Sequence, residues 1–275
     1  MWAFVIDQFV PEDKASLFVG DLAIQRGYGV FDFFKVINFV PVFLDEHLDR
    51  FYFSANEMRL NLAYSKDELK KIIFELLQKN NVSDTGVRIT LTGGYSQDGY
   101  QLSNPNLIVS LRSFNPPPVN ELAKSIKLIT YEHQRQLPHV KTIDYLMAIW
   151  LQPIVRQHNA DDILYHQKGI VTECPRSNFF ILTYGDKIIT PSENILKGVM
   201  RMKLLEAAIS NYQVEERALS IEEIKHAKEA FITSTTKTIL PVGQVDDYIF
   251  SKENKVTTQL YKLIVQLQSK QSLNV

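Results

Sequence analysis

The chain has 275 residues, of which 45% are hydrophobic and 22% charged, and its formal net charge at pH 7 is −1. This composition is ordinary for a globular protein, and it excludes the broad basic field that attracts nucleic acid or an anionic membrane. Cys174 is the only cysteine, which excludes an intramolecular disulfide.

Strands and helices alternate in the first part of the chain. The segments 2–8, 16–19 and 30–37 are rich in Val, Phe and Ile, which favours strands. A helix is predicted to begin at Asp45, because apolar residues recur after it at helical spacing. A second helix is predicted to begin at Ser65, where the pattern S-x-x-E indicates a capping box.

Two further strands, at 87–92 and 106–112, complete an N-terminal α+β domain that we place at 1–113. Three consecutive prolines then predict a linker over 114–120, because they remove three backbone donors and favour extended structure. The C-terminal domain is placed at 121–275.

Beyond the linker the pattern predicts strands and helices in alternation. The strands are expected at 125–131, 161–165, 169–173, 178–183, 187–190 and 229–234. The helices are expected at 142–158, at 198–211, from Ser220, where Glu223 is the partner in a second capping box, and at 252–268. Pro153 is expected to kink or shorten the helix at 142–158.

Targeting and metal signals are missing from the sequence. Residues 1–10 lack the basic segment and long apolar core of a signal peptide, and no uninterrupted apolar run approaches the ~18 residues of a membrane span. The histidines show no metal-ligand spacing such as HExxH. We therefore expect a cytoplasmic protein with no metal, nucleic acid or membrane partner.

Three side chains suit the chemistry of pyridoxal 5'-phosphate. Lys141 offers an amine for a Schiff base with the aldehyde, and Glu173 offers a carboxylate for the protonated ring nitrogen. Arg50 offers a planar guanidinium, which binds phosphate bidentately. Each also has a structural interpretation, as a solvated lysine, a strand-end glutamate or an ion-paired arginine.

The order and spacing of these motifs resemble the class IV aminotransferases, also called fold-type IV pyridoxal-phosphate enzymes. The resemblance extends from residues 21–31 to residues 241–242. It implies an α+β, two-domain fold with a smaller N-terminal α/β domain and a larger, β-barrel-like C-terminal domain surrounded by helices. It also implies a homodimer.

The resemblance assigns roles residue by residue. Lys141 becomes the catalytic Schiff-base residue and proton shuttle, and Glu173 the partner of the ring nitrogen. The phosphate is expected at Arg50, Val199, Met200 and Thr235, where the helix after Gly198 offers free N–H groups. The substrate is expected at Phe31, Arg88 and Thr236, although an arginine on a strand serves equally well in a structural ion pair.

Three features differ from the known subfamilies. The loop 93–100 lacks the Arg-x-His pair of D-amino acid aminotransferases. Gly86 and residues 142–145 replace two signatures of branched-chain enzymes. Asp32-Phe33 replaces the Thr-Thr that 4-amino-4-deoxychorismate lyases often show.

Three hypotheses about function follow. The first is an aminotransferase that moves an amino group from an amino acid, branched-chain or otherwise apolar, to a 2-oxo acid. The second is a 4-amino-4-deoxychorismate lyase that releases pyruvate and 4-aminobenzoate. The third is a non-catalytic protein on the same fold.

Overall fold

The computed structural model describes residues 1–113, 124–251 and 253–273. The chain divides into two compact units. The first unit comprises Met1–Asn115, Val140–Asp144 and Lys270–Val275, and the second comprises Pro116–His139 and Tyr145–Ser269. The predicted linker at 114–120 lies outside the described residues.

A six-stranded sheet forms the centre of the first unit, with the strand order β2-β1-β6-β5-β3-β4. Its long inner strands are antiparallel, and β3 pairs with β5 along nearly its whole length. The strands are β1 (Trp2–Val5), β2 (Gln8–Pro11), β3 (Gly29–Ile37), β4 (Val40–Pro41), β5 (Thr85–Thr92) and β6 (Leu107–Arg112).

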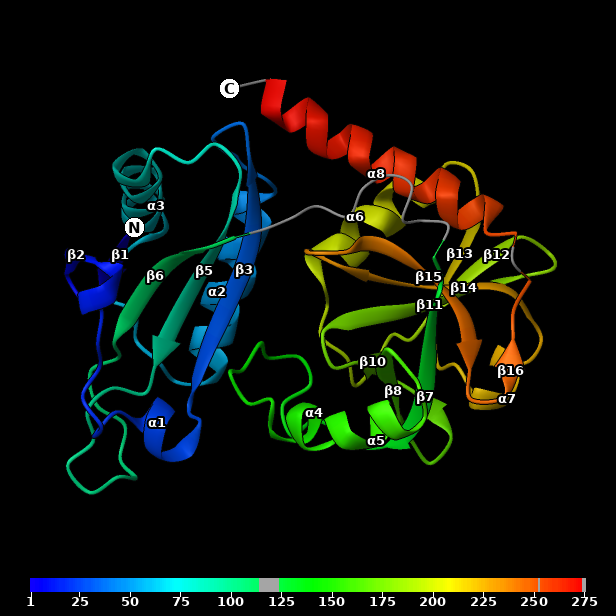
Figure 1. The fold of residues 1–275 in the computed structure, drawn as a ribbon, viewed down its shortest axis with the longest axis horizontal. Helices are drawn as coiled ribbons and strands as arrows, with labels where there is room; N and C mark the ends of the chain where they lie inside the picture. The colour runs from blue at the N-terminus through cyan, green and yellow to red at the C-terminus, as the bar shows by residue number, and fades with distance from the viewer. Residues whose placement is uncertain (114–123, 252, 274–275) are drawn as a thin grey trace. The chain divides into compact units, whose positions relative to one another are not determined.

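Two long helices, α2 (Leu44–Glu57) and α3 (Lys66–Asn80), bury their apolar stripes against this sheet in one core. Figure 1 shows α2 running along β3 and β5. The predicted capping box at the start of α3 is confirmed, since Ser65 and Glu68 satisfy each other's backbone N–H groups. A 3₁₀ turn, Glu12–Lys14, and a short helix, α1 (Leu22–Arg26), complete the unit.

The second unit contains a larger curled sheet with the order β13-β12-β11-β14-β15-β7-β8-β9. β10 pairs with β11, and β16 pairs with β15. The strands are β7 (Ile126–Glu132), β8 (Asp162–Gln167), β9 (Ile170–Val171), β10 (Glu173–Cys174), β11 (Ser177–Thr183), β12 (Lys187–Thr190), β13 (Gln213–Glu216), β14 (Ala227–Ser234), β15 (Thr238–Val245) and β16 (Tyr248–Ile249).

Helices accompany this sheet, as the resemblance implied, and the expected fold class is confirmed. They are α4 (Leu146–Trp150), α5 (Gln152–Gln157), α6 (Val199–Ala208), α7 (Ile221–Ile224) and α8 (Lys255–Leu273). Pro153 lies in the first turn of α5, so the expected break in the 142–158 helix is confirmed. Figure 1 shows α4 and α5 as two consecutive short helices.

Two expectations about elements were wrong, and some strands were not predicted. Residues 16–19 form no strand, and Phe18 and Val19 in that segment are exposed. Residues 142–145 are not helical, because Thr142 forms a bridge with Val30. Strands β13, β15 and β16 were not predicted; β15 contains Pro241 and Gly243, which obscure the strand pattern.

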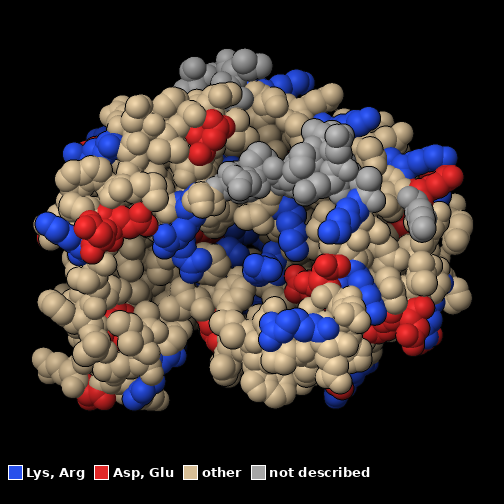
Figure 2. Space-filling view, viewed as in Figure 1, with Lys and Arg blue, Asp and Glu red and all other residues tan. Residues whose placement is uncertain are grey.

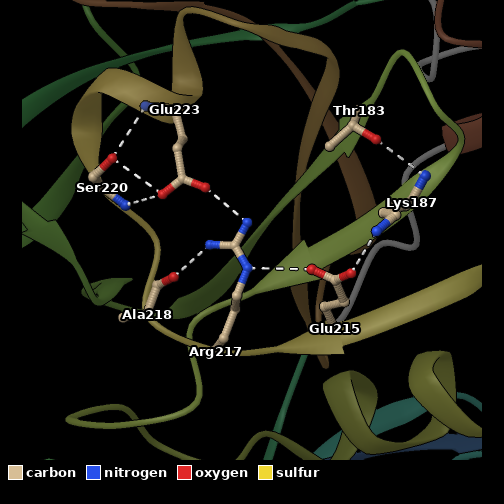
Figure 3. Close-up of polar contacts among 7 residues, drawn as sticks. All are labelled: Thr183, Lys187, Glu215, Arg217, Ala218, Ser220 and Glu223. Atoms are coloured by element: carbon tan, nitrogen blue, oxygen red, sulfur yellow. Dashed lines mark hydrogen bonds and ion pairs between the residues drawn. The ribbon is translucent and has the colours of Figure 1, made fainter.

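Ionic contacts link β12, β13 and α7 in the second unit (Figure 3). Arg217 donates to Glu215 and to Glu223, and Lys187 of β12 donates to Glu215. Glu223 also accepts from the backbone N–H of Ser220 at the start of α7. The network therefore joins two strands and one helix through side chains.

Charged residues of both signs lie next to one another over much of the face shown in Figure 2. This mixture is expected from the nearly neutral composition. Within the described ranges, no helix has the length and apolarity needed to cross a membrane.

Candidate active site

Lys141 lies in a short extended segment of the first unit, residues 140–144, that runs beside β3. The N–H of Phe31 donates to the Lys141 carbonyl at 3.0 Å, and the N–H of Ile143 donates to the Gly29 carbonyl at 3.0 Å. The Lys141 N–H donates to Ser54 Oγ at 3.2 Å. These bonds fix the Lys141 backbone against β3 and α2.

The amine of Lys141 lies over an aromatic ring. Its Nζ is 4.6 Å from the centroid of the Phe31 ring, and the Arg88 guanidinium carbon is 4.0 Å from the same centroid. Arg88 also donates through Nε to Thr90 Oγ1 at 3.3 Å. The structure therefore brings together three residues that the sequence singled out, with both cations at the face of one ring.

Arg50 lies on α2 and binds a buried carboxylate. Its Nε and Nη2 donate to the two oxygens of Asp32, each at 2.8 Å. His47 Nδ1 is 2.7 Å from Asp32 Oδ1, and because a carboxylate only accepts, Nδ1 carries the proton. Within the described part of the chain, Arg50 Nη1 makes no hydrogen bond. The two N–H groups of Nη1 therefore remain available to an anion.

Burial and neighbouring charges shift the pKa values of Asp32 and His47 in opposite directions. Burial raises the pKa of the Asp32 carboxyl, but Arg50 and His47 outweigh it and hold that pKa well below its ordinary range. Burial lowers the pKa of His47 below 6.5, and the neighbouring Asp32 carboxylate opposes this without reversing it. At neutral pH the cluster therefore contains ionised Asp32, charged Arg50 and neutral His47.

Glu173 is a buried carboxylate in β10 of the second unit. Its Oε1 accepts from Arg135 Nε at 3.0 Å, and its Oε2 accepts from the Leu196 N–H at 3.0 Å. A cation and a backbone donor thus favour the ionised form, as a partner of a protonated ring nitrogen requires. Arg135 was not predicted from the sequence, because it lies in an irregular segment without a distinctive pattern.

Gly198 begins α6, and no side chain caps this helix. A Cβ at Gly198 would lie 2.3 Å from Asn178 Oδ1, so the close packing at the turn requires glycine. The first N–H groups of α6, including those of Val199 and Met200, are of the kind that bind anions. The Met200 thioether instead accepts from Gln268 Nε2 of α8 at 3.7 Å.

Thr235 and Thr236 lie in the turn after β14 of the second unit. Thr235 is half-buried and Thr236 is exposed. Thr236 Oγ1 is 3.4 Å from Ser234 Oγ, which also accepts from the Lys237 N–H at 3.2 Å. Both hydroxyl residues therefore occupy a structured turn at a strand end.

These donor sets fit pyridoxal phosphate. In the second unit, the buried Glu173 carboxylate accepts from the backbone N–H of Leu196, two residues before the uncapped start of α6 at Gly198, where an added Cβ would meet Asn178. The first unit contains Lys141, whose backbone is fixed by hydrogen bonds, and Arg50, whose Nη1 is available to donate hydrogen bonds. Among the residues that the structure describes, no group of His, Cys, Asp and Glu side chains is arranged to hold a metal ion.

Cys174 adjoins Glu173 but belongs to the hydrophobic core of the second unit. Burial raises the pKa of its thiol well above the ordinary value, and the Asp162 carboxylate raises it further. The thiol is therefore a packing group and not a nucleophile.

Comparison with known proteins adds to this geometry. A D-alanine aminotransferase of Bacillus licheniformis is 28% identical over 87% of this chain and 86% of its own. A provisionally assigned branched-chain-amino-acid aminotransferase of Methanocaldococcus jannaschii is 27% identical over 100% of this chain and 99% of its own. The crystal structure of a provisionally assigned 4-amino-4-deoxychorismate lyase of Legionella pneumophila has a TM-score of 0.85, with 26% identity, covering 94% of this chain and 98% of that one.

The model of the family described as amino-transferase class IV matches residues 29–245. This range includes β3 with Phe31, the Lys141 segment, Glu173 and α6. The enzymes of this family depend on pyridoxal phosphate. The chain belongs to the class IV aminotransferases.

Proposed function

We propose that the protein is an aminotransferase that moves an amino group from an amino acid, branched-chain or otherwise apolar, to a 2-oxo acid. The observation that carries this proposal is the Lys141 amine, held 4.6 Å from the Phe31 ring centroid on a backbone anchored to β3. An aromatic wall beside the amine suits an apolar substrate side chain.

Lys141 would hold the cofactor through its amine, and Glu173 would face the ring nitrogen. Arg50 Nη1, the amides of Val199 and Met200, and Thr235 would bind the phosphate. When bound, pyridoxal phosphate supplies an electron sink for the electron pair left at the substrate α-carbon.

Lys141 would remove the proton from the α-carbon and return it during the transfer, as a positioned general base does. The charge of Arg88, held at the Phe31 ring, would attract the substrate carboxylate, and Thr236 would offer it a hydrogen bond. Glu173, ionised beside Arg135, would keep the ring nitrogen protonated.

The test is a screen of amino donors, in both L and D forms, with 2-oxoglutarate as the acceptor. We expect the highest rates with apolar donors, and no product with any donor despite bound cofactor would contradict the proposal. Lys141→Ala is expected to lower the rate by at least about 10³-fold. Lys228→Ala, which removes an exposed ion pair with Asp186, is the control and is expected to retain the parent rate.

A second candidate is 4-amino-4-deoxychorismate lyase, favoured by the 26% identity to the Legionella pneumophila protein over nearly its whole length. Lys141 would perform the same proton transfer, but the reaction would end in elimination. Pyruvate release from aminodeoxychorismate without an amino acceptor would identify this activity and would displace the first proposal.

We also propose a homodimer, which the family resemblance implies. Analytical ultracentrifugation of the holoenzyme is expected to give twice the chain mass of 31.7 kDa. A single species of chain mass at micromolar concentration would contradict it.

A further inference from the structure

Glu173 and Asn178 face each other across two neighbouring strands of the second unit. They are direct partners in the antiparallel pair of β10 and β11, so their side chains lie on the same face of the sheet. Both are 5% exposed. Polar side chains buried to this degree need hydrogen-bond partners, and those partners identify the part of the backbone that Glu173 and Asn178 position.

Both side chains hold the same backbone unit, that of Leu196. The Leu196 N–H donates to Glu173 Oε2 at 3.0 Å, and the Leu196 carbonyl accepts from Asn178 Nδ2 at 2.7 Å. Asn178 Nδ2 also lies 3.5 Å from Glu173 Oε2. The carboxylate and the amide thus fix the turn that leads into α6.

The other end of the Asn178 amide contacts the start of that helix. A Cβ at Gly198 would lie 2.3 Å from Asn178 Oδ1. Gly198 has φ −67° and ψ 141°, a conformation that alanine adopts without strain. The requirement for glycine therefore comes from Asn178 and not from the backbone angles.

We propose that Asn178 is a positioning residue, which sets the spacing between the Glu173 carboxylate and the anion-binding start of α6. This inference rests on the proposed function, in which these two groups hold the ring nitrogen and the phosphate of one cofactor. The cofactor ring is rigid, so the two groups must stand at a fixed separation. A side chain that contacts both sides of the Leu196–Gly198 turn provides that constraint.

The first experiment compares the dissociation constants of pyridoxal phosphate and of pyridoxal, which lacks the phosphate, in the parent and in Asn178→Ser. Serine is too short to reach the Leu196 carbonyl, whereas Glu173 keeps its bonds to Arg135 and to the Leu196 N–H. We expect pyridoxal phosphate to bind about 10-fold more weakly and pyridoxal to change by less than about 2-fold. Equal losses for both, or no loss, would overturn the inference.

The second experiment uses the contact between Asn178 and Gly198. In the parent, Gly198→Ala must push the Asn178 amide away from Leu196, so we expect a loss of pyridoxal phosphate affinity like that of Asn178→Ser. In the Asn178→Ser background the added methyl has room, and Gly198→Ala should change the affinity by less than about 2-fold. If the fold-losses of pyridoxal phosphate affinity in the two single variants multiply in the double variant, the two residues act independently and the inference is overturned.

Thr190→Val is the matched control for a merely structural effect. Thr190 Oγ1 donates to the Phe179 carbonyl at 2.8 Å, a buried bond from a side chain to the backbone of β11, the strand that carries Asn178. Its loss should lower the thermal midpoint and leave the ratio of the two dissociation constants unchanged; a changed ratio would overturn the inference. A parent chain that binds neither compound would overturn the proposed function as well, whereas normal parent binding with an unaffected Asn178→Ser overturns this inference alone.

Discussion

Asp32 is a fully buried carboxylate within β3, a largely apolar strand, and its charge is balanced by Arg50 and His47. A buried ion pair adds little to stability compared with an apolar pair, but removal of one partner is costly. The value of Asp32 therefore lies in orienting the Arg50 guanidinium, whose Nε and Nη2 it holds. Under the proposed function, the remaining edge of the guanidinium, with Nη1, would bind the phosphate.

Asp32→Asn tests this interpretation. It leaves Arg50 buried without its counter-charge, so the free energy of unfolding is expected to fall by roughly 3–5 kcal/mol. The variant should also bind pyridoxal phosphate more weakly than the parent, because Arg50 is no longer held. Urea denaturation and a cofactor titration measure the two effects, and a variant with parental values for both would contradict the assignment.

The same carboxylate predicts acid sensitivity. Its pKa is lowered in the folded protein, so its contribution to stability is present above the unfolded pKa of about 4 and is lost as the pH falls below that value. Denaturation curves between pH 3 and pH 6 should show a steeper loss of stability in the parent than in Asp32→Asn. Parallel curves would rule out Asp32 as the source.

His47 predicts a second pH dependence, in a higher range. Its pKa is lowered by burial, so the unfolded chain binds a proton near pH 6.5 that the folded chain does not. The unfolding free energy should therefore fall as the pH drops below 6.5, by up to about 1.4 kcal/mol per pH unit. His47→Asn should reduce that slope, and an unchanged slope between pH 5.5 and 7.5 would contradict the prediction.

At the scale of elements, local signals predicted helices better than strands. The capping boxes at Ser65 and Ser220 identified the starts of α3 and α7, because their bonds form within one turn. The segment 16–19 is rich in strand-forming residues but forms no strand, because strand propensity mainly reflects packing against neighbours. Residues 142–145 are not helical, and the bridge that Thr142 forms depends on Val30 of β3, which is distant in the sequence.

Ser220→Ala tests the coupling between a helix cap and the ionic network of Figure 3. Ser220 Oγ accepts from the Glu223 N–H, and Glu223 in turn accepts from Arg217. The loss of the cap is expected to lower the unfolding free energy by about 1 kcal/mol. Ser83→Ala, which removes only an exposed contact with Asp84, is the control and should stay within about 0.5 kcal/mol. Equal effects of the two substitutions would show that the cap contributes nothing.

At the scale of the molecule, the family and fold class could be predicted from the order of motifs, since that order reflects the whole chain. Lys141, Phe31 and Arg88 were predicted individually, and in the structure Lys141 and Arg88 both lie over the Phe31 ring. Arg135 and the bridging role of Asn178 could not be predicted, because both depend on contacts with residues far along the chain. Asp32 could have been noticed in the sequence, because it places a carboxylate inside a largely apolar strand.

The segment with Lys141 should behave as part of the first unit's sheet. Native-state hydrogen exchange is expected to protect the Phe31 and Ile143 amides as strongly as those of β5, since Phe31 donates to the Lys141 carbonyl and Ile143 to the Gly29 carbonyl of β3. Fast exchange at Ile143, comparable with that of an exposed loop, would show that the segment opens independently.

The assignment of residues 140–144 to the first unit has a consequence for how this protein can be recombined. Three separate segments of the chain form the first unit, and the second of them, residues 140–144, contains Lys141. A chimera made with a single crossover after residue 113 would combine the Phe31 and Arg88 of one parent with the lysine segment of another. If these residues bind the substrate as proposed, exchange of substrate preference between relatives is expected to need a cassette that carries β3, β5 and residues 140–144 together.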